Sequence, residues 1–600
     1  MASQGGGRIV CQAPAPTLPP NLCSSIFRTV HDLLSTDITL RTLTSCSRIG
    51  VICDDRQRPF VSEFFELFKV PWEFHVAERG YDVVIVSTRT DRIPAARLVV
   101  VFGSEEQPWD VFRLRRRDAV GGGLVLEQKR RRFPVYRTTA TLEQASGRTI
   151  KVAGRDEAAG AEYNVGDQIV LRIGYDLFEE VGWLLSHGQP VERARTPTLD
   201  IHVDMLREWI LEAGLPLVEV PPRPDGCDFA VCLTHDVDFI KIRDQMIDRS
   251  VLGFIARALI PARLRDSASN IVWSRLFRNW KAVLSLPGVY FGFLRDIWFD
   301  IDRYQELERA LGSTYFFIPV KGHPGDRRAT GEREPQLRSA PYDAADYKPL
   351  IADLSAEGVE VAVHGVDAWQ SSARGERERN IIGSLAGERP AGIRMHWLYF
   401  SERSPQLLEE AGFTYDSTLG YNDNVGFRSG TTQVFRLPGT SQLLELPLTV
   451  MDSALFYPSR MGLSESDALA ACTDLVATMT AHGGAFTINW HTRSLGPERN
   501  WDSFYMDLLA LLKTRSVWFA TAKDAVQWFR TRRLIQFDTL TAGPHEVRVN
   551  VAGLDSIGPG FFVRFHQPSA AGRRGEGACE TPGYVDIPLT GCRTELETVV

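Results

Sequence analysis

The sequence predicts an α/β fold built around a barrel of parallel strands. Four short apolar runs end in, or carry, polar side chains, and they cover residues 229–238, 358–365, 391–397 and 485–491. Continuous apolar runs of this length are typical of strands buried on both faces. The carboxyl ends of such strands are where α/β folds place their chemistry, so we expect the polar residues to meet at one edge.

The first of these runs ends in Thr234-His235-Asp236-Val237-Asp238. Two carboxylates this close repel each other and usually share a cation or a proton. A polar turn in which Asp236 caps a helix is the structural alternative for the same residues.

Histidines are concentrated at these strand ends. The chain has 12 histidines, and four of them end or adjoin the runs: His235, His364, His396 and His491. One such histidine is more often structural than a ligand. Four strands that bring Asp and His together instead suit a divalent metal with nitrogen and oxygen ligands, accompanied by an acid/base pair.

The order of these motifs resembles that of the polysaccharide deacetylase family (carbohydrate esterase family 4, the NodB-homology domain) over residues 225–535. The resemblance implies a NodB-like (β/α)7 distorted TIM-type barrel. It also implies that Asp236 is the general base and Asp238 a metal ligand. Arg394 matches the family arginine that orients the catalytic Asp.

The metal-binding motif of that family is His-X-X-X-His, and this chain departs from it. His364 matches the first histidine, whereas Ala368 stands at the second. We expect His396, which occupies a position where the family usually has proline, to supply the missing imidazole. The alternatives are Asp367, His235 and His323.

Two further motifs complete the resemblance. Ile488-Asn489-Trp490-His491 is similar to the family's Leu-X-X-His, which implies that His491 is the general acid. Tyr415-Asp416-Ser417-Thr418 is similar to the motif whose Asp tunes that histidine, which implies this role for Asp416. The cofactor implied is a divalent metal, with zinc expected first and cobalt or another first-row metal as alternatives. Trp397, Tyr399 and Trp490 are either a wall against a sugar ring or core aromatics.

Composition and charge exclude several classes of protein. The formal net charge of −7 argues against a nucleic-acid partner, and we interpret the basic runs 115–117 and 129–132 as solvated faces. Met1–Pro20 has no long apolar core, and Val283–Leu294 is too short to span a bilayer, so we expect no secretory signal and no transmembrane segment. The nine cysteines form no disulfide framework and no Cys-X-X-Cys pair. A cytoplasmic protein is the expectation, and no feature predicts its oligomeric state.

The chain divides into four predicted regions. Residues 1–25 read as a disordered tail, and residues 46–220 as an N-terminal α/β accessory domain with a β-meander over 124–172. Pro221-Pro222-Arg223-Pro224 is a stiff break before the catalytic barrel at 225–535, which has a helical insertion at 241–311. Alternating apolar residues after Arg533 predict a small β domain and loose tail at 536–600.

The predicted function is that of a metal-dependent hydrolase that removes an acetyl group from an N-acetylated sugar or a surface-polysaccharide precursor. The expected partner is therefore a carbohydrate substrate. One alternative is hydrolysis of another non-peptide C–N bond. The other is a glycan-binding pseudo-enzyme whose metal site is eroded at Ala368.

Overall fold

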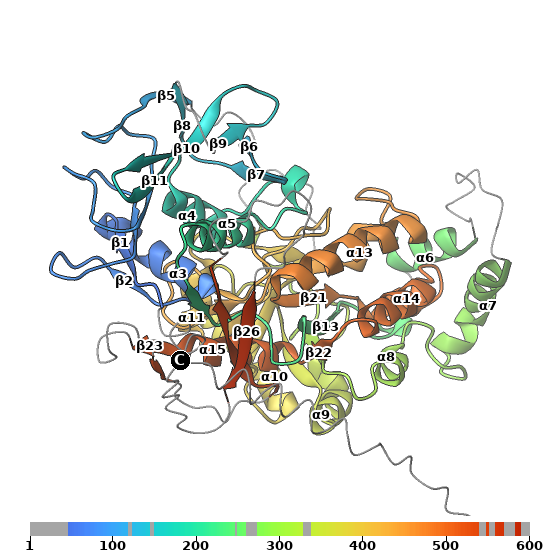
Figure 1. Ribbon diagram of the computed structural model, residues 1–600. Helices are drawn as coiled ribbons and strands as arrows, with labels where there is room; N and C mark the ends of the chain where they lie inside the picture. Colours follow the sequence, from blue (N-terminus) through green and yellow to red (C-terminus); the bar gives the residue numbers. More distant parts are fainter. Residues whose placement is uncertain are drawn as a thin grey trace, which may run out of the picture.

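The computed structural model describes residues 46–117, 123–143, 149–245, 249–259, 273–327, 338–538, 548–550, 558–568 and 583–589. Within these ranges the chain is a mixed α/β protein with two large sheets (Figure 1). The predicted tail at 1–25 lies outside the described residues, as does most of the predicted loose end after Ser569. Among the helices described, none combines the length and the hydropathy that crossing a membrane requires.

The N-terminal part forms an 11-stranded sheet. Its strands are β1 (Ile49–Ile52), β2 (Trp72–Phe74), β3 (Val83–Val86), β4 (Leu98–Phe102), β5 (Arg113–Arg117), β6 (Leu124–Gln128), β7 (Arg131–Val135), β8 (Thr139–Glu143), β9 (Thr149–Val152), β10 (Ala158–Val165) and β11 (Gln168–Ile173). The first four strands pair in parallel and continue into β11, whereas the strands from β5 to β10 pair antiparallel. The sheet therefore has a parallel part, β1 to β4 with β11, and an antiparallel part, β5 to β10.

Three helices link this sheet to the rest of the molecule: α3 (Arg58–Phe68), α4 (Leu177–Ser186) and α5 (Thr198–Glu212). Buried polar contacts fasten them to the second sheet. Asp200 on α5 accepts hydrogen bonds from Thr431 and Thr432, and the buried Arg532 donates to the Leu67 carbonyl at the end of α3. One hydrophobic core also runs through both parts. The two sheets are therefore packed together rather than joined only by the chain.

The second sheet has ten strands and carries the predicted motifs. Its strands are β13 (Phe229–Val237), β14 (Ser313–Phe317), β15 (Glu360–Gly365), β16 (Gly392–Met395), β17 (Tyr415–Asp416), β18 (Phe435–Arg436), β19 (Leu444–Glu445), β20 (Leu448–Met451), β21 (Ala485–Asn489) and β22 (Val517–Phe519). Every pair is parallel except β18 with β19. The predicted α/β class with parallel strands is confirmed.

The described strands of this sheet follow an open path from β18 to β20. However, β19 and β20 are separated in the chain only by Leu446 and Pro447, although they lie near opposite ends of that path. A link this short requires the ends of the sheet to approach each other, because the three steps from Glu445 to Leu448 span at most about 11 Å. The sheet is therefore curled, which turns the carboxyl ends of its central strands toward a common centre.

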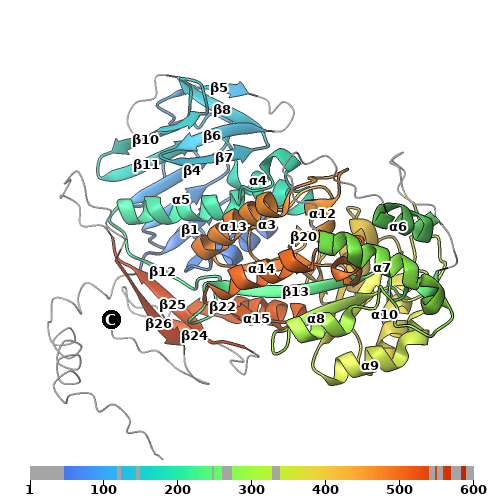
Figure 2. The same cartoon turned by 90° about the vertical axis from the view of Figure 1, so that its right-hand side faces the viewer.

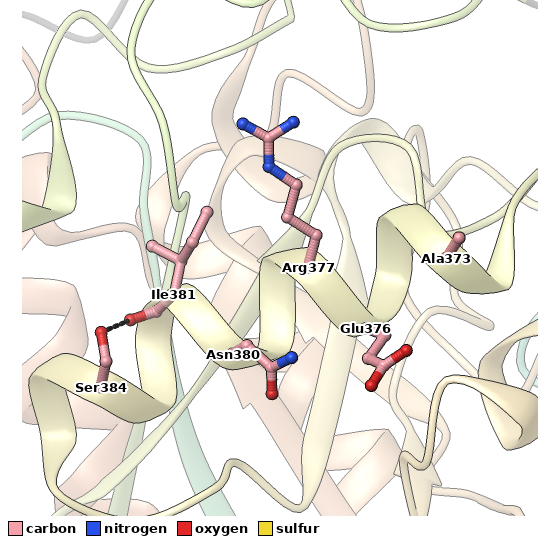
Figure 3. Close-up of a pocket in the computed structure, with 6 residues that line it drawn as sticks. All are labelled: Ala373, Glu376, Arg377, Asn380, Ile381 and Ser384. Carbon is pink, nitrogen blue, oxygen red and sulfur yellow. Dashed lines mark hydrogen bonds between the residues drawn. The ribbon is translucent and has the colours of Figure 1, made fainter.

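Helices connect the parallel strands and pack around the sheet (Figure 2). They are α9 (Lys348–Ala356), α10 (Ser372–Ala386), α11 (Ser404–Glu410), α12 (Asp452–Phe456), α13 (Glu465–His482), α14 (Asp502–Lys513) and α15 (Ala522–Leu534). Helix α10 shows why they lie where they do. Its Glu376, Arg377 and Asn380 point to solvent (Figure 3), whereas Ile382 and Leu385 are buried. This amphipathic spacing fixes which face of the helix packs inward.

The insertion between β13 and β14 contains α6 (Arg249–Leu259), α7 (Trp273–Tyr290) and α8 (Ile301–Leu307). Figure 1 shows α7 at the edge of the molecule, and Figure 2 shows it facing the viewer. The insertion has a small core of its own, in which Phe254, Leu286 and Trp298 pack together. The sequence predicts a helical insertion at 241–311, and the helices fall within it.

The C-terminal strands do not stand apart from the rest of the chain. Strands β25 (Phe561–His566) and β26 (Tyr584–Leu589) form a hairpin that pairs with β12 (Leu217–Glu219), which precedes the predicted barrel. Phe561 also stacks on Trp528 of α15, with ring centroids 4.7 Å apart. A separate pair, β23 (Gln536–Asp538) with β24 (Arg548–Asn550), follows α15. The alternating pattern after Arg533 thus falls on strands. Strands β25 and β26 form one sheet with β12, which comes from a much earlier part of the chain.

Candidate active site

Strand β13 places two carboxylates at the carboxyl edge of the curled sheet. All nine residues of the strand are buried, and it pairs with β14 on one side and β21 on the other. The strand ends with Asp236 inside the sheet and Asp238 just beyond it. The side chain of Asp236 is 5% exposed and that of Asp238 is 21% exposed, so Asp238 faces the opening.

Asp236 is held as an ionised carboxylate. Its Oδ1 accepts a hydrogen bond from Arg394 Nη1 at 2.9 Å, and its Oδ2 accepts one from Asn489 Nδ2 at 2.7 Å. Burial by itself raises the pKa of Asp236, but His364, Arg394 and His491 outweigh burial and hold that pKa below its ordinary value. The contact between Arg394 and Asp236 is the one that the motif resemblance implies.

Arg394 is itself fully buried, and several hydrogen bonds fix the orientation of its guanidinium. Its guanidinium donates to Thr234 Oγ1, to the Ser417 carbonyl and to Ser417 Oγ, and it lies over the Phe316 ring. A planar guanidinium with this many fixed partners cannot rotate away from Asp236.

The three predicted metal ligands converge. The side chains of Asp238, His364 and His396 offer ligand atoms that all lie within 4.8 Å of one another. Asp238 Oδ1 is 3.4 Å from His364 Nε2 and 3.5 Å from His396 Nε2. The same oxygen is buried and has no hydrogen-bond partner among the residues that the structure describes, which is costly unless a cation completes its surroundings.

The two histidines direct their Nε2 atoms at Asp238, and the Nδ1–H of His364 donates to the Arg394 carbonyl 2.9 Å away. Burial lowers the pKa of His364, but Asp236 and Asp238 outweigh burial and raise it. Burial lowers the pKa of His396 to about 4, so this imidazole is neutral near pH 7. Two nitrogens and one oxygen match the three protein ligands of a catalytic zinc site. The residues present therefore fit a divalent metal.

His491 stands on the opposite side of Asp238, where β21 ends. Its Nε2 is 3.7 Å from Asp238 Oδ2, and its Nδ1 is 2.6 Å from Asp452 Oδ1. Asp452 also accepts from the His491 backbone N–H and from Ser494 Oγ. Burial lowers the pKa of His491, but Asp452 outweighs burial and raises it. A histidine held in this way can carry a proton and release it.

The expected partnership between Asp416 and His491 is wrong. Asp416 is fully buried on β17, where its Oδ1 accepts a hydrogen bond from Thr418, whereas His491 Nδ1 is paired with Asp452 and His491 Nε2 faces Asp238. Burial raises the pKa of Asp416 to about 7. The motif similarity located a strand-end Asp correctly, but the carboxylate beside His491 Nδ1 belongs to Asp452.

Asp452 and Asn489 are the site residues that the sequence analysis missed. Asp452 follows the apolar run of β20 directly, in the same strand-then-carboxylate pattern that marks Asp236. Asn489 is two residues before His491, at the end of β21. Applying the strand-end criterion to residues 448–452 would have found Asp452.

The alternatives for the missing histidine are occupied elsewhere. His323 Nε2 is 2.5 Å from Asp367 Oδ2, and Asp367 also accepts from the buried Arg338. His235 Nε2 lies 3.0 Å from Glu308 Oε1, and its Nδ1 lies 2.8 Å from the Trp490 carbonyl. His396 is thus the second imidazole beside His364. It stands where the family motif predicts the contribution of a histidine at position 368.

The three aromatic residues near the motifs divide between core and surface. Trp490 and Tyr399 are buried, whereas Trp397 is 42% exposed beside His396. Trp397 has a φ of 65°, a left-handed conformation that a bulky residue rarely adopts. Trp397 is therefore the only one of the three placed to meet a ligand at the opening.

The depression lined by Ala373, Glu376, Arg377, Asn380, Ile381 and Ser384 lies on α10 and is shallow (Figure 3). These side chains point away from the helix axis along one exposed face. None of the site residues above belongs to it.

Replacing Asp452 should separate its role from that of Asp416. We expect Asp452→Asn to lower kcat about 10–100-fold with little change in KM, because a neutral amide no longer holds His491 charged and oriented. Asp416→Asn is the matched control. It should keep kcat within about two-fold of wild type, because Asp416 does not contact His491 and its loss leaves the pairing of His491 with Asp452 unchanged. Steady-state kinetics on both variants, with thermal unfolding to verify the fold, checks this. A larger loss in the Asp416 variant would restore the assignment made from the motif.

Comparison with known proteins gives structural neighbours only. No protein-family model matches this chain, and no curated protein matches its sequence. Solved structures similar to it include polysaccharide deacetylases, the family whose motif order it resembles. One, from Mycobacterium smegmatis, is 21% identical with a TM-score of 0.31, and the match covers 54% of this chain and 98% of that one.

Two other solved structures extend this picture. A polysaccharide deacetylase from Pseudomonas aeruginosa PAO1 is 16% identical with a TM-score of 0.33, over 52% of this chain and 94% of that one. The carbohydrate deacetylase Agd3 is 10% identical with a TM-score of 0.35, over 91% of this chain and 99% of that one. At these identities and TM-scores, function is inferred from the side chains of the site.

Proposed function

We propose that the protein is a metal-dependent hydrolase that removes the acetyl group from an N-acetylated sugar. The observation that carries this proposal is the convergence of Asp238, His364 and His396 between Asp236 and His491. A site with a ligand triad, a fixed carboxylate and a charged histidine contains the groups that amide hydrolysis needs. The convergence also argues against the pseudo-enzyme alternative, because His396 fills the place left by Ala368.

A divalent ion held by the triad would acidify a bound water and polarise the substrate carbonyl. Asp236 is ionised and stands beside the triad, so it accepts the proton of the attacking water. Arg394 keeps Asp236 in position and in the charged form during that transfer. His491, raised in pKa by Asp452, delivers a proton to the departing amine nitrogen.

The substrate class follows from the opening of the site. The partly exposed groups are Asp238, His396 and His491, with Trp397 beside them. An exposed indole offers a flat apolar face of the kind on which a sugar ring can lie. Acetate release from N-acetylated sugar oligomers, with and without a chelator, tests the proposal. Binding of such oligomers without acetate release, in protein loaded with metal, would contradict it.

His396 is the residue that most directly tests the metal site. We expect His396→Ala to lose bound metal, with about 10–100-fold weaker affinity or more, because one of three ligands is removed. His323→Ala is the matched control, since His323 is paired with Asp367, and it should keep its metal. Elemental analysis of the purified variants measures the result. Full metal content in the His396 variant would mean that another side chain completes the site.

A further inference from the structure

We infer that the helical insertion formed by α6 and α7 is a docking surface for a lipid bilayer. Helix α7 and the turn after it carry an exposed aromatic stripe, defined as Trp273, Phe277, Trp280, Leu284 and Phe291. The exposed fractions of these side chains are 59%, 60%, 37%, 81% and 76%. Their spacing of four, three, four and seven residues keeps them on one face of a helix.

The aromatic stripe is not needed to hold the insertion together. The opposite face of α7 supplies the buried residues Ala282, Leu286 and Val289, which pack against α6 and Trp298. Helix α7 is therefore apolar on two faces, and only one of them is covered. Helices of that kind are normally buried all round, and a large exposed apolar patch marks a surface that binds something.

The patch extends beyond the helix. Phe293 is 84% exposed, with its ring centroid 6.4 Å from that of Phe291, and Leu294 is 51% exposed. On the helix itself, Phe277 contacts both Trp273 and Trp280, with ring centroids 6.4 and 5.8 Å apart. The exposed rings thus form two groups, one on α7 and one on the turn after it, at the edge of the molecule where α7 lies (Figure 1).

Residue type and charge favour a bilayer as the occupant. Trp and Phe are the residues that interfacial helices place among lipid headgroups. Residues 249–259 and 273–295 contain six basic residues and no acidic residue, in a chain whose net charge is −7: Arg249, Arg257, Arg275, Arg278, Lys281 and Arg295. Basic residues attract anionic lipid headgroups to the extent that they are not already paired within the protein.

The basic side chains are not all free to act on lipid. Arg257, Arg275, Arg278 and Arg295 form ion pairs with Glu498, Glu465, Asp502 and Asp302 respectively. Lys281, next to Trp280, is exposed. We therefore expect insertion of the aromatic stripe to supply most of the affinity, with anionic lipid strengthening it.

A second copy of the chain is the competing occupant. The spacing of the stripe would suit a coiled coil, but such seams are built from Leu, Ile and Val knobs rather than from Trp and Phe. The exposed Pro287 also lies in the same register, between Leu284 and Phe291. Both features disfavour close pairing of two helices, whereas neither hinders lying in a lipid interface.

The covered face of α7, opposite the aromatic stripe, meets the loop that follows His491. Arg257 pairs with Glu498, Asn279 accepts from the Glu498 backbone N–H, and Glu498 pairs with Arg493. The insertion is thus fixed to residues 493–498 by polar contacts, while the aromatic stripe stays on the other side of α7. The bilayer inference uses none of the proposed catalytic roles, so it is independent of the proposed function.

The test is sedimentation of the full chain with phosphatidylcholine vesicles, with and without phosphatidylglycerol. Wild-type protein should bind, more strongly when phosphatidylglycerol is present. The double variant Phe291→Ser with Phe293→Ser should bind at least about ten-fold more weakly, since two large apolar side chains no longer enter the interface. Val111→Ser with Leu534→Ser is the matched control, because those side chains are 61% and 50% exposed elsewhere. It should bind as wild type does.

Three outcomes would overturn the inference. Wild-type protein could fail to bind either kind of vesicle, or the Phe291/Phe293 double variant could bind as strongly as wild type. Light scattering could also show a wild-type dimer that the double variant converts to a monomer, without vesicle binding, which would identify a second copy as the occupant. An unchanged thermal unfolding midpoint in the variant shows that lost binding does not come from lost folding.

Discussion

Asp236→Asn is expected to lower turnover about 10²–10⁴-fold while the bound metal is retained. The amide keeps the size of the side chain and can still meet Arg394, but it cannot accept a proton from water. Asp236 is not one of the three converging ligands, so metal content should remain near that of wild type. Acetate release measured at saturating substrate, alongside elemental analysis, checks both parts of the expectation.

The control for this variant is Asn489→Ala. It removes the hydrogen bond from Asn489 Nδ2 to the Asp236 carboxylate and the one from the Asp236 backbone N–H to Asn489 Oδ1, but it leaves the carboxylate and its contact with Arg394. We expect a much smaller loss of turnover, about ten-fold, in keeping with the one hydrogen bond of about 1–1.5 kcal/mol that the carboxylate itself loses. An Asp236 variant that turns over at the wild-type rate with metal bound would exclude Asp236 as the base.

His491→Ala should slow amide hydrolysis by a similar factor, about 10²–10⁴-fold, because the leaving amine needs a proton. An aryl acetate ester has a good leaving group and needs little protonation. The same variant should therefore hydrolyse such an ester at a rate much closer to wild type, whereas the Asp236 variant stays impaired on both substrates. The ratio of ester to amide rates in the two variants is the measurement.

That comparison distinguishes a general acid from a structural histidine. If His491 only supported the fold, its loss would impair ester and amide hydrolysis equally and would lower the unfolding midpoint. Equal impairment with metal retained would contradict the role proposed here.

Much of the site could be predicted because its residues follow buried strands. Asp236, Asp238, His364 and His491 all stand where an apolar run ends, and parallel strands bring such ends together. The expectation that His396 replaces the histidine missing at Ala368 also agrees with the placement of the three side chains. That placement depends on β15 and β16 being adjacent, which the order of the motifs along the chain already favours.

The parts that could not be predicted depend on partners distant in sequence. Asp416 and Asp452 both follow strands, and only the curled sheet determines which of them reaches His491. The attachment of β25 to β12 joins segments more than 340 residues apart, as the 347-residue separation of His566 and Glu219 shows. Local periodicity identifies a strand but carries no information on which edge it will join.

Arg394 serves the site through two different parts of one residue. Its guanidinium holds Asp236, and its backbone carbonyl receives the His364 N–H. A substitution at position 394 changes the first contact and leaves the second intact, because every amino acid keeps its carbonyl. A mutation at position 394 therefore does not change the tautomer of His364, whereas it does change how strongly Asp236 is held in its ionised form. A single substitution at position 394 would thus remove the group that holds Asp236 ionised and leave the convergence of Asp238, His364 and His396 in place.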